Sequence, residues 1–262
     1  MEAKKFLKVG KNVNFKVATD GLEYNLEPGK VYSINIDRYS GSISLEDNGT
    51  FDMLEKVYST EKDDKFVAKV LKHYNESGLG FTGVMLTGTK GSGKTITAKR
   101  IAMESGLPII NIERNINPAF ISKTVKLLGD TSVCFFFDEL DKVLEDYDDS
   151  ALLQILDGSD TKGKHLILFT CNDDSELSEY LIDRCSRIRY WREFDEISTS
   201  MIDCILEDVL DDKKEKKSLI DFINENFSVK SFDNIISFVN EVNSFPTDTF
   251  EELFEDMNLT SK

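Results

Sequence analysis

The stretch that decides the fold reads Gly88-Thr89-Lys90-Gly91-Ser92-Gly93-Lys94-Thr95. The apolar run 84–86 precedes it, and a helix-forming run begins after it at Ile96. Three glycines allow a tight turn in which backbone N–H groups and the positive end of the next helix face an anion. We therefore expect residues 88–96 to bind a nucleoside triphosphate, with Lys94 on the β- and γ-phosphates and Thr95 on Mg²⁺. A plain glycine turn between a strand and a helix is the alternative.

Length and charge limit the possible architectures and partners. The chain has 262 residues, with 32 basic and 48 acidic side chains and a formal net charge of −16. This length predicts one large α/β domain with a small appendage, or two modest domains. The charge argues against an outer surface that binds nucleic acid through its phosphates, although a narrow basic channel inside a ring stays open.

Cysteine usage and hydropathy indicate the compartment. The four cysteines form no Cys-x-x-Cys pair, and Cys134 and Cys171 lie in apolar, strand-like runs, so we expect reduced thiols. No apolar stretch approaches the roughly 18 residues of a membrane span, and the N-terminus lacks the apolar core of a signal peptide. The sequence predicts a cytoplasmic protein, in the host cytoplasm if the source is viral, with no membrane partner.

Hydrophobic periodicity divides the chain into four regions. Residues 1–50 alternate and turn like short antiparallel strands, which predicts a small β-rich N-terminal domain. Residues 51–80 have helical spacing and predict a linker of two helices. Residues 81–192 alternate strand-length apolar runs with amphipathic stretches, which is typical of a parallel sheet with crossover helices. Residues 193–262 predict a helical subdomain with an acidic tail.

A second motif, residues 133–139, is an apolar strand that ends in Asp138 and Glu139. Open α/β sheets bind ligands at the carboxyl ends of their strands. We expect Asp138 to bind Mg²⁺ or its water and Glu139 to activate the attacking water. Read alone, the motif is better explained as a buried strand that ends in a solvated acidic turn, but its position about 40 residues after the phosphate loop favours the catalytic interpretation.

A third apolar run, 166–171, ends at Asn172. If this strand lies between the two strands already described, Asn172 lies near the γ-phosphate and helps to place the water. An ordinary turn residue is the alternative.

These motifs together resemble the AAA clade of the AAA+ ATPases over about residues 80–240. The residues that carry the resemblance are 83–88 at the entry to the phosphate loop, 138–141, 152–158, 170–172 and 181–188. Thr89-Lys90 stands where that family usually has a Pro-Pro pair. The resemblance implies a P-loop AAA+ domain with a five-stranded parallel sheet in the order 5-1-4-3-2 and a C-terminal helical lid.

The segment 181–188 resembles the element from which this family supplies its arginine fingers. The resemblance implies that Arg184 and Arg187 project into the nucleotide site of a neighbouring subunit and stabilise transition-state charge. It also implies a homo-oligomer, expected to be a hexameric ring. The alternatives are that only one arginine is a finger, or that either pairs with nearby acids.

Two further residues are candidates by position. Lys230 lies where the family lid usually places a phosphate-sensing arginine, and an exposed lysine at a helix start is the alternative. Phe120 is the aromatic candidate for a pore loop in the segment 113–131, but Asn117 and Pro118 predict a helix start that turns it toward the core. The shortness of this segment resembles stand-alone AAA proteins of tailed bacteriophages and the mitochondrial clade that moves a folded Rieske protein.

Three hypotheses for the function follow. The first is an oligomeric ATPase that remodels, assembles or disassembles a protein partner recognised by residues 1–50. The second is a DNA-associated AAA+ ATPase in replication or packaging, which the negative charge disfavours. The third is a scaffold that binds ATP and scarcely hydrolyses it, which the presence of Glu139 and the arginine pair disfavours.

Overall fold

The computed structural model describes most of the chain, and its contacts divide it into two units. The described residues are 6–15, 23–37, 39–52, 56–78, 80–114, 116–143, 152, 156, 163–172, 177, 188–194, 196–213 and 215–260. Unit 1 comprises Met1–Met53, Phe66–Thr87 and Thr95–Glu193. Unit 2 comprises Leu54–Lys65, Gly88–Lys94 and Phe194–Lys262.

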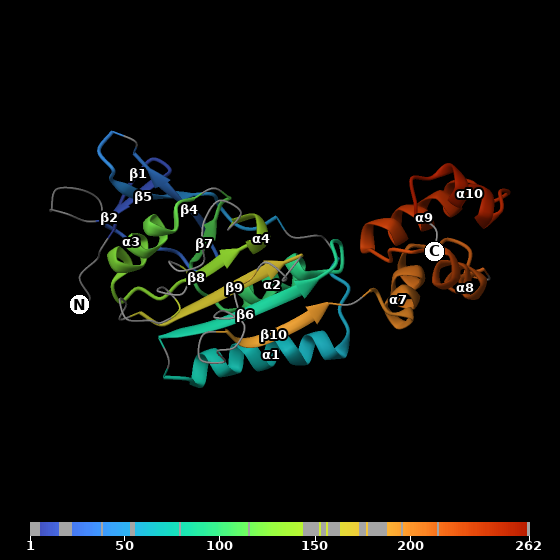
Figure 1. Ribbon diagram of the computed structural model, residues 1–262, viewed down its shortest axis with the longest axis horizontal. Coiled ribbons are helices and arrows are strands. Elements are labelled where there is room, and N and C mark those ends of the chain that lie inside the picture. Colours follow the sequence, from blue (N-terminus) through green and yellow to red (C-terminus); the bar gives the residue numbers. More distant parts are fainter. Residues whose placement is uncertain are drawn as a thin grey trace. The chain divides into compact units, whose positions relative to one another are not determined.

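A single β-sheet organises unit 1 (Figure 1). Within the described residues it has ten strands in the order β10-β6-β9-β8-β7-β4-β5-β2-β1-β3. Their bounds are β1 Phe6–Val9, β2 Asn12–Phe15, β3 Glu23–Tyr24, β4 Val31–Ile36, β5 Ile43–Asp47, β6 Phe81–Gly88, β7 Ile109–Ile112, β8 Cys134–Phe137, β9 His165–Cys171 and β10 Ile188–Phe194.

The centre of the sheet is parallel and buried. β6 pairs with β9, β9 with β8, and β8 with β7, all in parallel. Every residue of β8 and β9 is buried, as expected for strands covered on both faces. The predicted α/β class is confirmed, and each of the five strand-length apolar runs after residue 80 forms a strand. These five strands lie side by side in the order β10-β6-β9-β8-β7. Numbered by their position in the chain, that order is 5-1-4-3-2.

The N-terminal strands differ from the expectation of a separate β-rich domain, because they continue the same sheet. β4 pairs in parallel with β7, with Val31 opposite Ile109, and the hydrogen bond from Ile109 N to Lys30 O (2.8 Å) extends this ladder. The reason lies in β4 itself: Val31, Tyr32 and Ser33 are consecutively buried, so both faces of this strand are covered. Beyond β4, the strands β5, β2, β1 and β3 continue the sheet in antiparallel pairs. The sheet in the described residues is therefore wider than the expected five strands.

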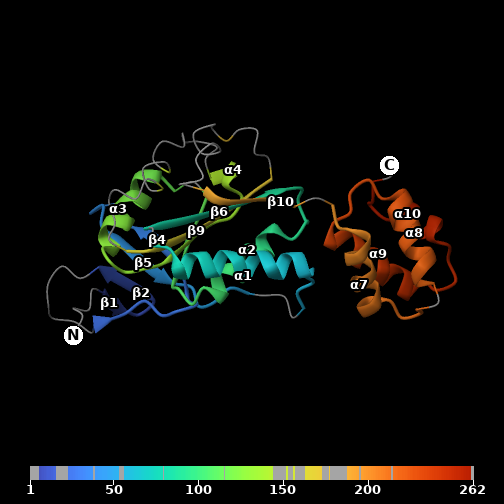
Figure 2. The ribbon, with the colours of Figure 1, turned by 90° about the horizontal axis from the view of Figure 1, so that it is seen from below.

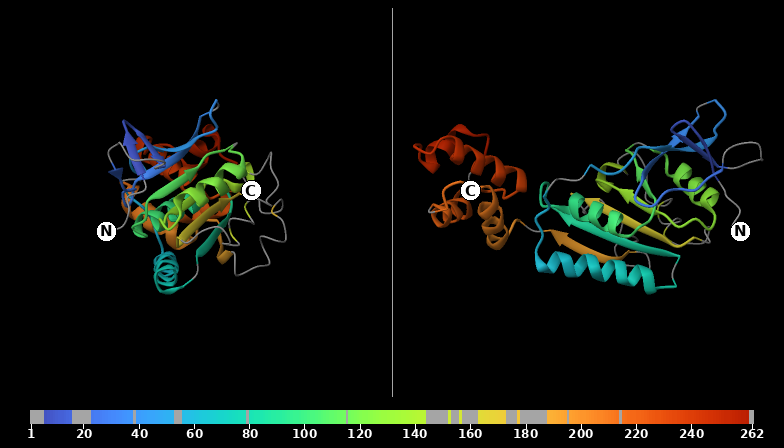
Figure 3. Two further views of the ribbon diagram at one scale, coloured as in Figure 1. Left: turned by 90° about the vertical axis from the view of Figure 1, so that its left-hand side faces the viewer. Right: turned by 180° about the vertical axis from the view of Figure 1, so that it is seen from behind.

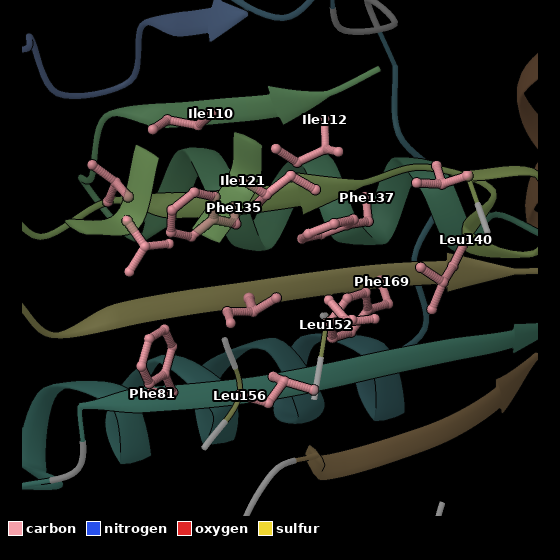
Figure 4. Close-up of a cluster of buried hydrophobic side chains, with 14 of the residues drawn as sticks. Phe81, Ile110, Ile112, Ile121, Phe135, Phe137, Leu140, Leu152, Leu156 and Phe169 are labelled. Atoms are coloured by element: carbon pink, nitrogen blue, oxygen red, sulfur yellow. The ribbon is translucent and has the colours of Figure 1, made fainter. Parts of the chain in front are cut away.

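Helices cover both faces of the sheet in unit 1. They are α1 Glu61–Glu76, α2 Lys94–Glu104, α3 Pro118–Leu128 and α4 Leu140–Val143. Side chains of α3 and α4 pack with Phe135, Phe137 and Phe169 in one apolar cluster on one face (Figure 4). α1 and α2 lie together on the other face (Figure 2). Layers of this kind bury the apolar surface of a parallel sheet from both sides.

In the part that the structure describes, the linker before β6 contains one of the two expected helices. Thr60 caps α1, because its Oγ1 accepts from Asp63 N (3.2 Å) while the Asp63 carboxylate accepts from Thr60 N (2.7 Å). This reciprocal cap starts the helix at Glu61. The described residues 51, 52 and 56–60 are not helical, so the first predicted helix is wrong for that part of the chain.

Among the described residues of unit 2 that follow β10 there are four helices, and the last of them lies in the segment expected to be an acidic tail (Figure 3). They are α7 Thr199–Val209, α8 Lys216–Asn226, α9 Phe232–Ser244 and α10 Phe250–Asp256. Ser198, Ser231 and Thr249 cap three of them with side-chain oxygens. Their core contains the rings of Phe222, Phe227, Phe238 and Phe254, with neighbouring centroids 5.1 to 6.2 Å apart. Across the described residues of both units, no helix has the length and apolar character needed to cross a bilayer.

His165, at the start of β9, is a fully buried titratable side chain. Its ring lies against Phe81 and Phe135, with centroids 5.2 and 5.5 Å away, and its Nδ1 accepts a hydrogen bond from Val133 N (3.3 Å). Burial disfavours the charged imidazole and lowers the pKa of His165 from 6.5 to about 4. The native state therefore binds fewer protons than the unfolded state between these two values.

We predict that His165 lowers the stability of the protein as the pH falls from 7 to 5. Because the native pKa is depressed, the unfolded state gains a proton first, and the free energy of unfolding should fall by about 2 kcal/mol over this range. His165→Asn keeps an acceptor for Val133 N and removes the titration. Urea unfolding at both pH values should show a loss in the wild type that exceeds the loss in His165→Asn by this amount. Equal losses in both proteins would contradict the assignment.

Candidate active site

The loop between β6 and α2 has the backbone conformation that its glycines predict. Gly88, Gly91 and Gly93 have φ angles of 128°, 78° and 95°. These values lie in the region that favours glycine, because a Cβ there is strained. Space is also limited: a Cβ at Gly88 would lie 2.1 Å from Phe194 O, and one at Gly91 would lie 2.7 Å from Ser231 Cβ. Both contacts are within unit 2.

Hydrogen bonds inside the loop hold its lysine. Lys94 is 5% exposed, and its Nζ donates to Gly88 O and to Thr89 O, each at 2.6 Å. The Ser92 hydroxyl also donates to Thr89 O, at 2.7 Å. Thr89 and Lys90, which stand in place of the Pro-Pro pair, are exposed, and the Thr89 carbonyl serves as the acceptor that organises the loop. Ile96 follows within α2 and is half-buried.

The start of α9 lies against this loop. Phe232 N donates to Gly91 O (3.2 Å), and the Phe232 ring lies beside Gly93. The Tyr58 ring stacks on the Phe232 ring, with centroids 6.2 Å apart and an interplanar angle of 17°. Tyr58 also donates to Asp208 (2.6 Å). Flat apolar rings beside a phosphate loop suit the face of a nucleoside base. Neither Tyr58 nor Phe232 was predicted as a site residue, because no motif or spacing in the sequence points to them.

Asp138 lies at the carboxyl end of β8 and contacts the residue that follows the loop. Thr95 Oγ1 donates to Asp138 Oδ1 at 2.8 Å, across 43 residues of sequence. Both residues belong to unit 1. Magnesium is usually bound by hydroxyl, carboxylate and phosphate oxygens, with one or two carboxylates from the protein. The donor set of Thr95 and Asp138 therefore fits this ion when it is shared with a nucleotide.

Glu139 has an unusual backbone and a crowded carboxylate. It is the one non-glycine residue with positive φ (55°) in the described part of the chain. Its carboxylate forms ion pairs with Arg114 and with Lys142 (2.8 Å). Asn172 Nδ2 donates to the same carboxylate at 3.3 Å, and Asn172 N donates to Asp141 Oδ1 at 3.3 Å. Such strained positions are common where a side chain is aimed at a reaction.

The prediction that Asn172 lies near the γ-phosphate required its strand to lie between the two other strands that end in the site. β9 does lie between β6 and β8, so the three carboxyl ends meet at one edge, as their arrowheads show in Figure 1. Arg114, two residues beyond β7, reaches the same edge and was not predicted. The rule that strand ends form the site could have found it, because β7 pairs with β8.

The other predicted residues are placed as follows. Lys230 precedes the cap of α9, and its Nζ contacts Glu196 Oε2 at 3.3 Å. Phe120 lies in the first turn of α3, half-buried, after the cap formed by Asn117. Arg184 and Arg187 lie outside the described residues. Of the segment 152–158, Leu152 and Leu156 are described, and both are buried in the apolar cluster of unit 1.

Residues 84–193 match the family model for AAA, the ATPase family associated with various cellular activities. The match supports placing this segment in the AAA+ ATPase superfamily, and it implies nucleotide binding and ATPase activity in the general sense. No curated protein sequence matches this chain.

We predict that Gly91→Ala weakens nucleotide binding at least about tenfold, because the added Cβ displaces the loop from Ser231. Gly49→Ala is the matched control: Gly49 has a similar φ (83°), but its Cβ would meet nothing within 4 Å. Both variants should lose about 1 to 2 kcal/mol of stability from the left-handed backbone. Titration with a fluorescent ATP analogue, beside thermal unfolding, separates the two effects. Equal affinities for the two variants would show that the contact with Ser231 does not shape the loop.

Proposed function

We propose that the chain is an oligomeric, Mg²⁺-dependent AAA+ ATPase that uses ATP hydrolysis to remodel, assemble or disassemble a protein partner. The observation that supports hydrolysis best is the hydrogen bond from Thr95 to Asp138 (2.8 Å), which joins the end of the phosphate loop to the acidic motif. The adjacent contact between Asn172 and Glu139 supports it further. A scaffold that merely binds nucleotide would need neither Glu139 nor Asn172 in these places.

Each residue has a distinct role in the proposed reaction. Lys94 neutralises charge on the β- and γ-phosphates, and the loop N–H groups orient them. Thr95 and Asp138 would hold Mg²⁺, which supplies charge neutralisation at the phosphates. Glu139 accepts a proton from the attacking water at its carboxylate, while Asn172 orients that water through its amide. Tyr58 and Phe232 offer aromatic surface to the base, and Lys230 adds positive charge.

The remaining charge is supplied by a second subunit in this proposal. Arg184 and Arg187 lie in the segment that resembles the arginine-finger element, and a guanidinium is permanently charged and planar. A finger of this kind typically contributes a factor of about 10³ to 10⁵ in rate. A homo-oligomeric ring, expected to be a hexamer, would place these arginines in the neighbouring site, so the monomer should be nearly inactive.

Mixing two inactive variants tests the shared site. Glu139→Gln removes the base, and Arg184→Ala or Arg187→Ala removes a finger, so each protein alone should bind ATP and hydrolyse almost none. In a random one-to-one mixture, roughly a quarter of the sites combine an intact base with an intact finger from the next subunit. The mixture should therefore regain up to this fraction of the wild-type rate. Mass measured with and without ATP should show assembly in the same samples.

Arg189→Ala is the control for the loss of an arginine from this part of the chain. Arg189 is exposed on β10, and its variant should keep full activity alone. Mixtures of Glu139→Gln with each finger variant could instead assemble normally but regain no ATPase activity. That result would mean that both arginines act within their own subunit. Full turnover by a demonstrably monomeric sample would rule out the oligomeric site.

Residues 1–50 are proposed to recognise the protein partner. Tyr39, in the turn between β4 and β5, is fully exposed. Asp37 holds this turn, since its Oδ1 accepts from Tyr39 N (3.0 Å) and Ser40 N (2.7 Å). Hydrogen bonds from the Ser40 N–H, from the Ser40 hydroxyl and then from the Tyr39 N–H lower the pKa of Asp37, so the turn is kept at neutral pH. An exposed tyrosine on a preformed turn suits a protein interface, because tyrosine loses little conformational entropy on binding.

We predict that Tyr39→Ala weakens partner binding about tenfold or more while the basal ATPase rate stays unchanged. Deletion of residues 1–50 is a poor test, because β4 pairs with β7 and its loss would expose the sheet edge. Glu139→Gln protein is used to capture partners from a lysate of the source cells, with and without Tyr39→Ala. Phe245→Ser, at an aromatic residue of unit 2 that is 48% exposed, controls for the loss of any surface ring. Equal capture of partners by the proteins with Tyr39→Ala and with Phe245→Ser would argue against recognition through Tyr39.

The finer points of this proposal rest on the sequence resemblance. The short segment 113–131 supports a remodeller that does not thread its substrate, of the kind found in stand-alone AAA proteins of tailed bacteriophages. A cytoplasmic site of action, in the host if the source is viral, accords with a chain of four cysteines, of which Cys134 and Cys171 are buried in the sheet.

A further inference from the structure

Thr170 is a buried polar residue in β9 to which the proposed reaction gives no role. Its side chain is 1% exposed, and it precedes Asn172 by two residues. Its hydroxyl donates to Asp138 Oδ1 at 2.7 Å and accepts from Glu139 N at 2.9 Å. One hydroxyl thus contacts both residues of the acidic motif, from a different strand.

These bonds form a continuous chain across the site in unit 1. Thr95 Oγ1 donates to the same Oδ1 of Asp138 at 2.8 Å. The order is therefore Glu139 N–H, Thr170 hydroxyl, Asp138 carboxylate and Thr95 hydroxyl. The Thr170 hydroxyl both accepts and donates, so its two hydrogen bonds strengthen each other, and the bonds to the Asp138 carboxylate are the strongest members of the chain.

The chain fixes how the Asp138 carboxylate is presented. Oδ1 accepts two hydroxyl hydrogen bonds, whereas Oδ2 accepts none from the described residues. A carboxylate held by one oxygen cannot rotate freely, so its second oxygen keeps one direction. That oxygen is the one available to a metal ion or to the water bound to it.

The same hydroxyl holds the backbone at Glu139. The φ of 55° there is a conformation that side chains other than glycine rarely adopt. Such a conformation persists when the surroundings fix it. The Glu139 N–H, which is partly buried, donates to Thr170 Oγ1 at 2.9 Å, and this bond holds the backbone in place.

We propose that Thr170 is a positioning residue that couples the metal-binding carboxylate of Asp138 to the backbone that aims Glu139. The inference rests on the proposed ATPase function, and it adds a residue that acts through Asp138 and Glu139 without touching the nucleotide. Loss of the hydroxyl would free both residues at once: the Asp138 carboxylate would lose a donor, and the Glu139 amide would lose its acceptor.

The chain offers a matched control in Thr82. This residue lies on β6, the strand paired with β9, and it is also 1% exposed. Its Oγ1 has no hydrogen-bond partner among the described residues. Threonine to valine at position 82 or 170 removes a buried hydroxyl while the size and shape of the side chain are kept.

The test compares Thr170→Val, Thr170→Ser and Thr82→Val with the wild type. In the protein without nucleotide, the Glu139 amide should exchange with solvent about tenfold faster in Thr170→Val, because its hydrogen bond is lost. With ATP, kcat should fall about 10- to 100-fold, because the hydrogen bond from the Thr170 hydroxyl to the charged Asp138 carboxylate is lost. KM should change less than about threefold, because Thr170 does not touch the nucleotide. The Mg²⁺ concentration that gives half-maximal binding of a fluorescent ATP analogue should rise severalfold. Thr170→Ser should restore all three values, and Thr82→Val should change none.

The outcomes separate this inference from the proposed function. If the wild type shows no Mg²⁺-dependent ATPase activity, the proposed function fails, whereas the exchange and Mg²⁺ measurements still test Thr170. If the wild type is active and Thr170→Val matches it in exchange, kcat and Mg²⁺ dependence, the positioning role is wrong. Equal losses in Thr170→Val and Thr82→Val would also overturn it, because they would reflect the loss of any buried hydroxyl.

Discussion

The parallel pairing of β9 between β6 and β8 is the constraint on which the site depends. Parallel strands end at the same edge of a sheet, so this pairing brings together the residues that follow β8 and β9. Register matters as much as order. Phe137 lies opposite Phe169, and a slip of one residue would turn Thr170 toward the opposite face of the sheet. The buried phenylalanines therefore fix the polar contacts of Asp138 through the register that they require.

The sequence predicted those parts of the fold that depend on local pattern. Short, fully apolar runs such as 133–137 are typical of strands covered on both faces, and the runs after residue 80 each contain a strand. The pairing of β4 with β7 was not predictable in this way. β4 was recognised as a strand, but nothing in its own residues says which distant edge it will join. The burial of the consecutive residues Val31, Tyr32 and Ser33, which shows that both faces of the strand are covered, is a result of this pairing and is visible only in the structure.

The same distinction explains the site. Asp138, Glu139 and Asn172 were predicted because each ends an apolar strand, a property visible in the sequence. Arg114 was missed although it follows the end of β7, because its pairing with Glu139 is visible only in the structure. Thr170 belongs to the segment 170–172 that carries the resemblance, but its contact with Asp138 was not predicted. Lys230 shows the converse. Its position in sequence suggested a phosphate contact, whereas its Nζ lies 3.3 Å from Glu196, a pairing that no spacing rule anticipates.

Glu139 combines a fixed backbone with an exchangeable side chain. Its N–H donates to buried Thr170, and its C=O accepts from Lys142 N (2.8 Å) and Val143 N (3.1 Å), the last two residues of α4. Its carboxylate, in contrast, pairs with Arg114 and Lys142, whose side chains are 53% and 42% exposed. Ion pairs this exposed contribute about 0 to 1 kcal/mol and exchange partners readily, whereas buried hydrogen bonds to the backbone do not. The carboxylate can therefore leave its cations for a water molecule without any change in the strained backbone that aims it.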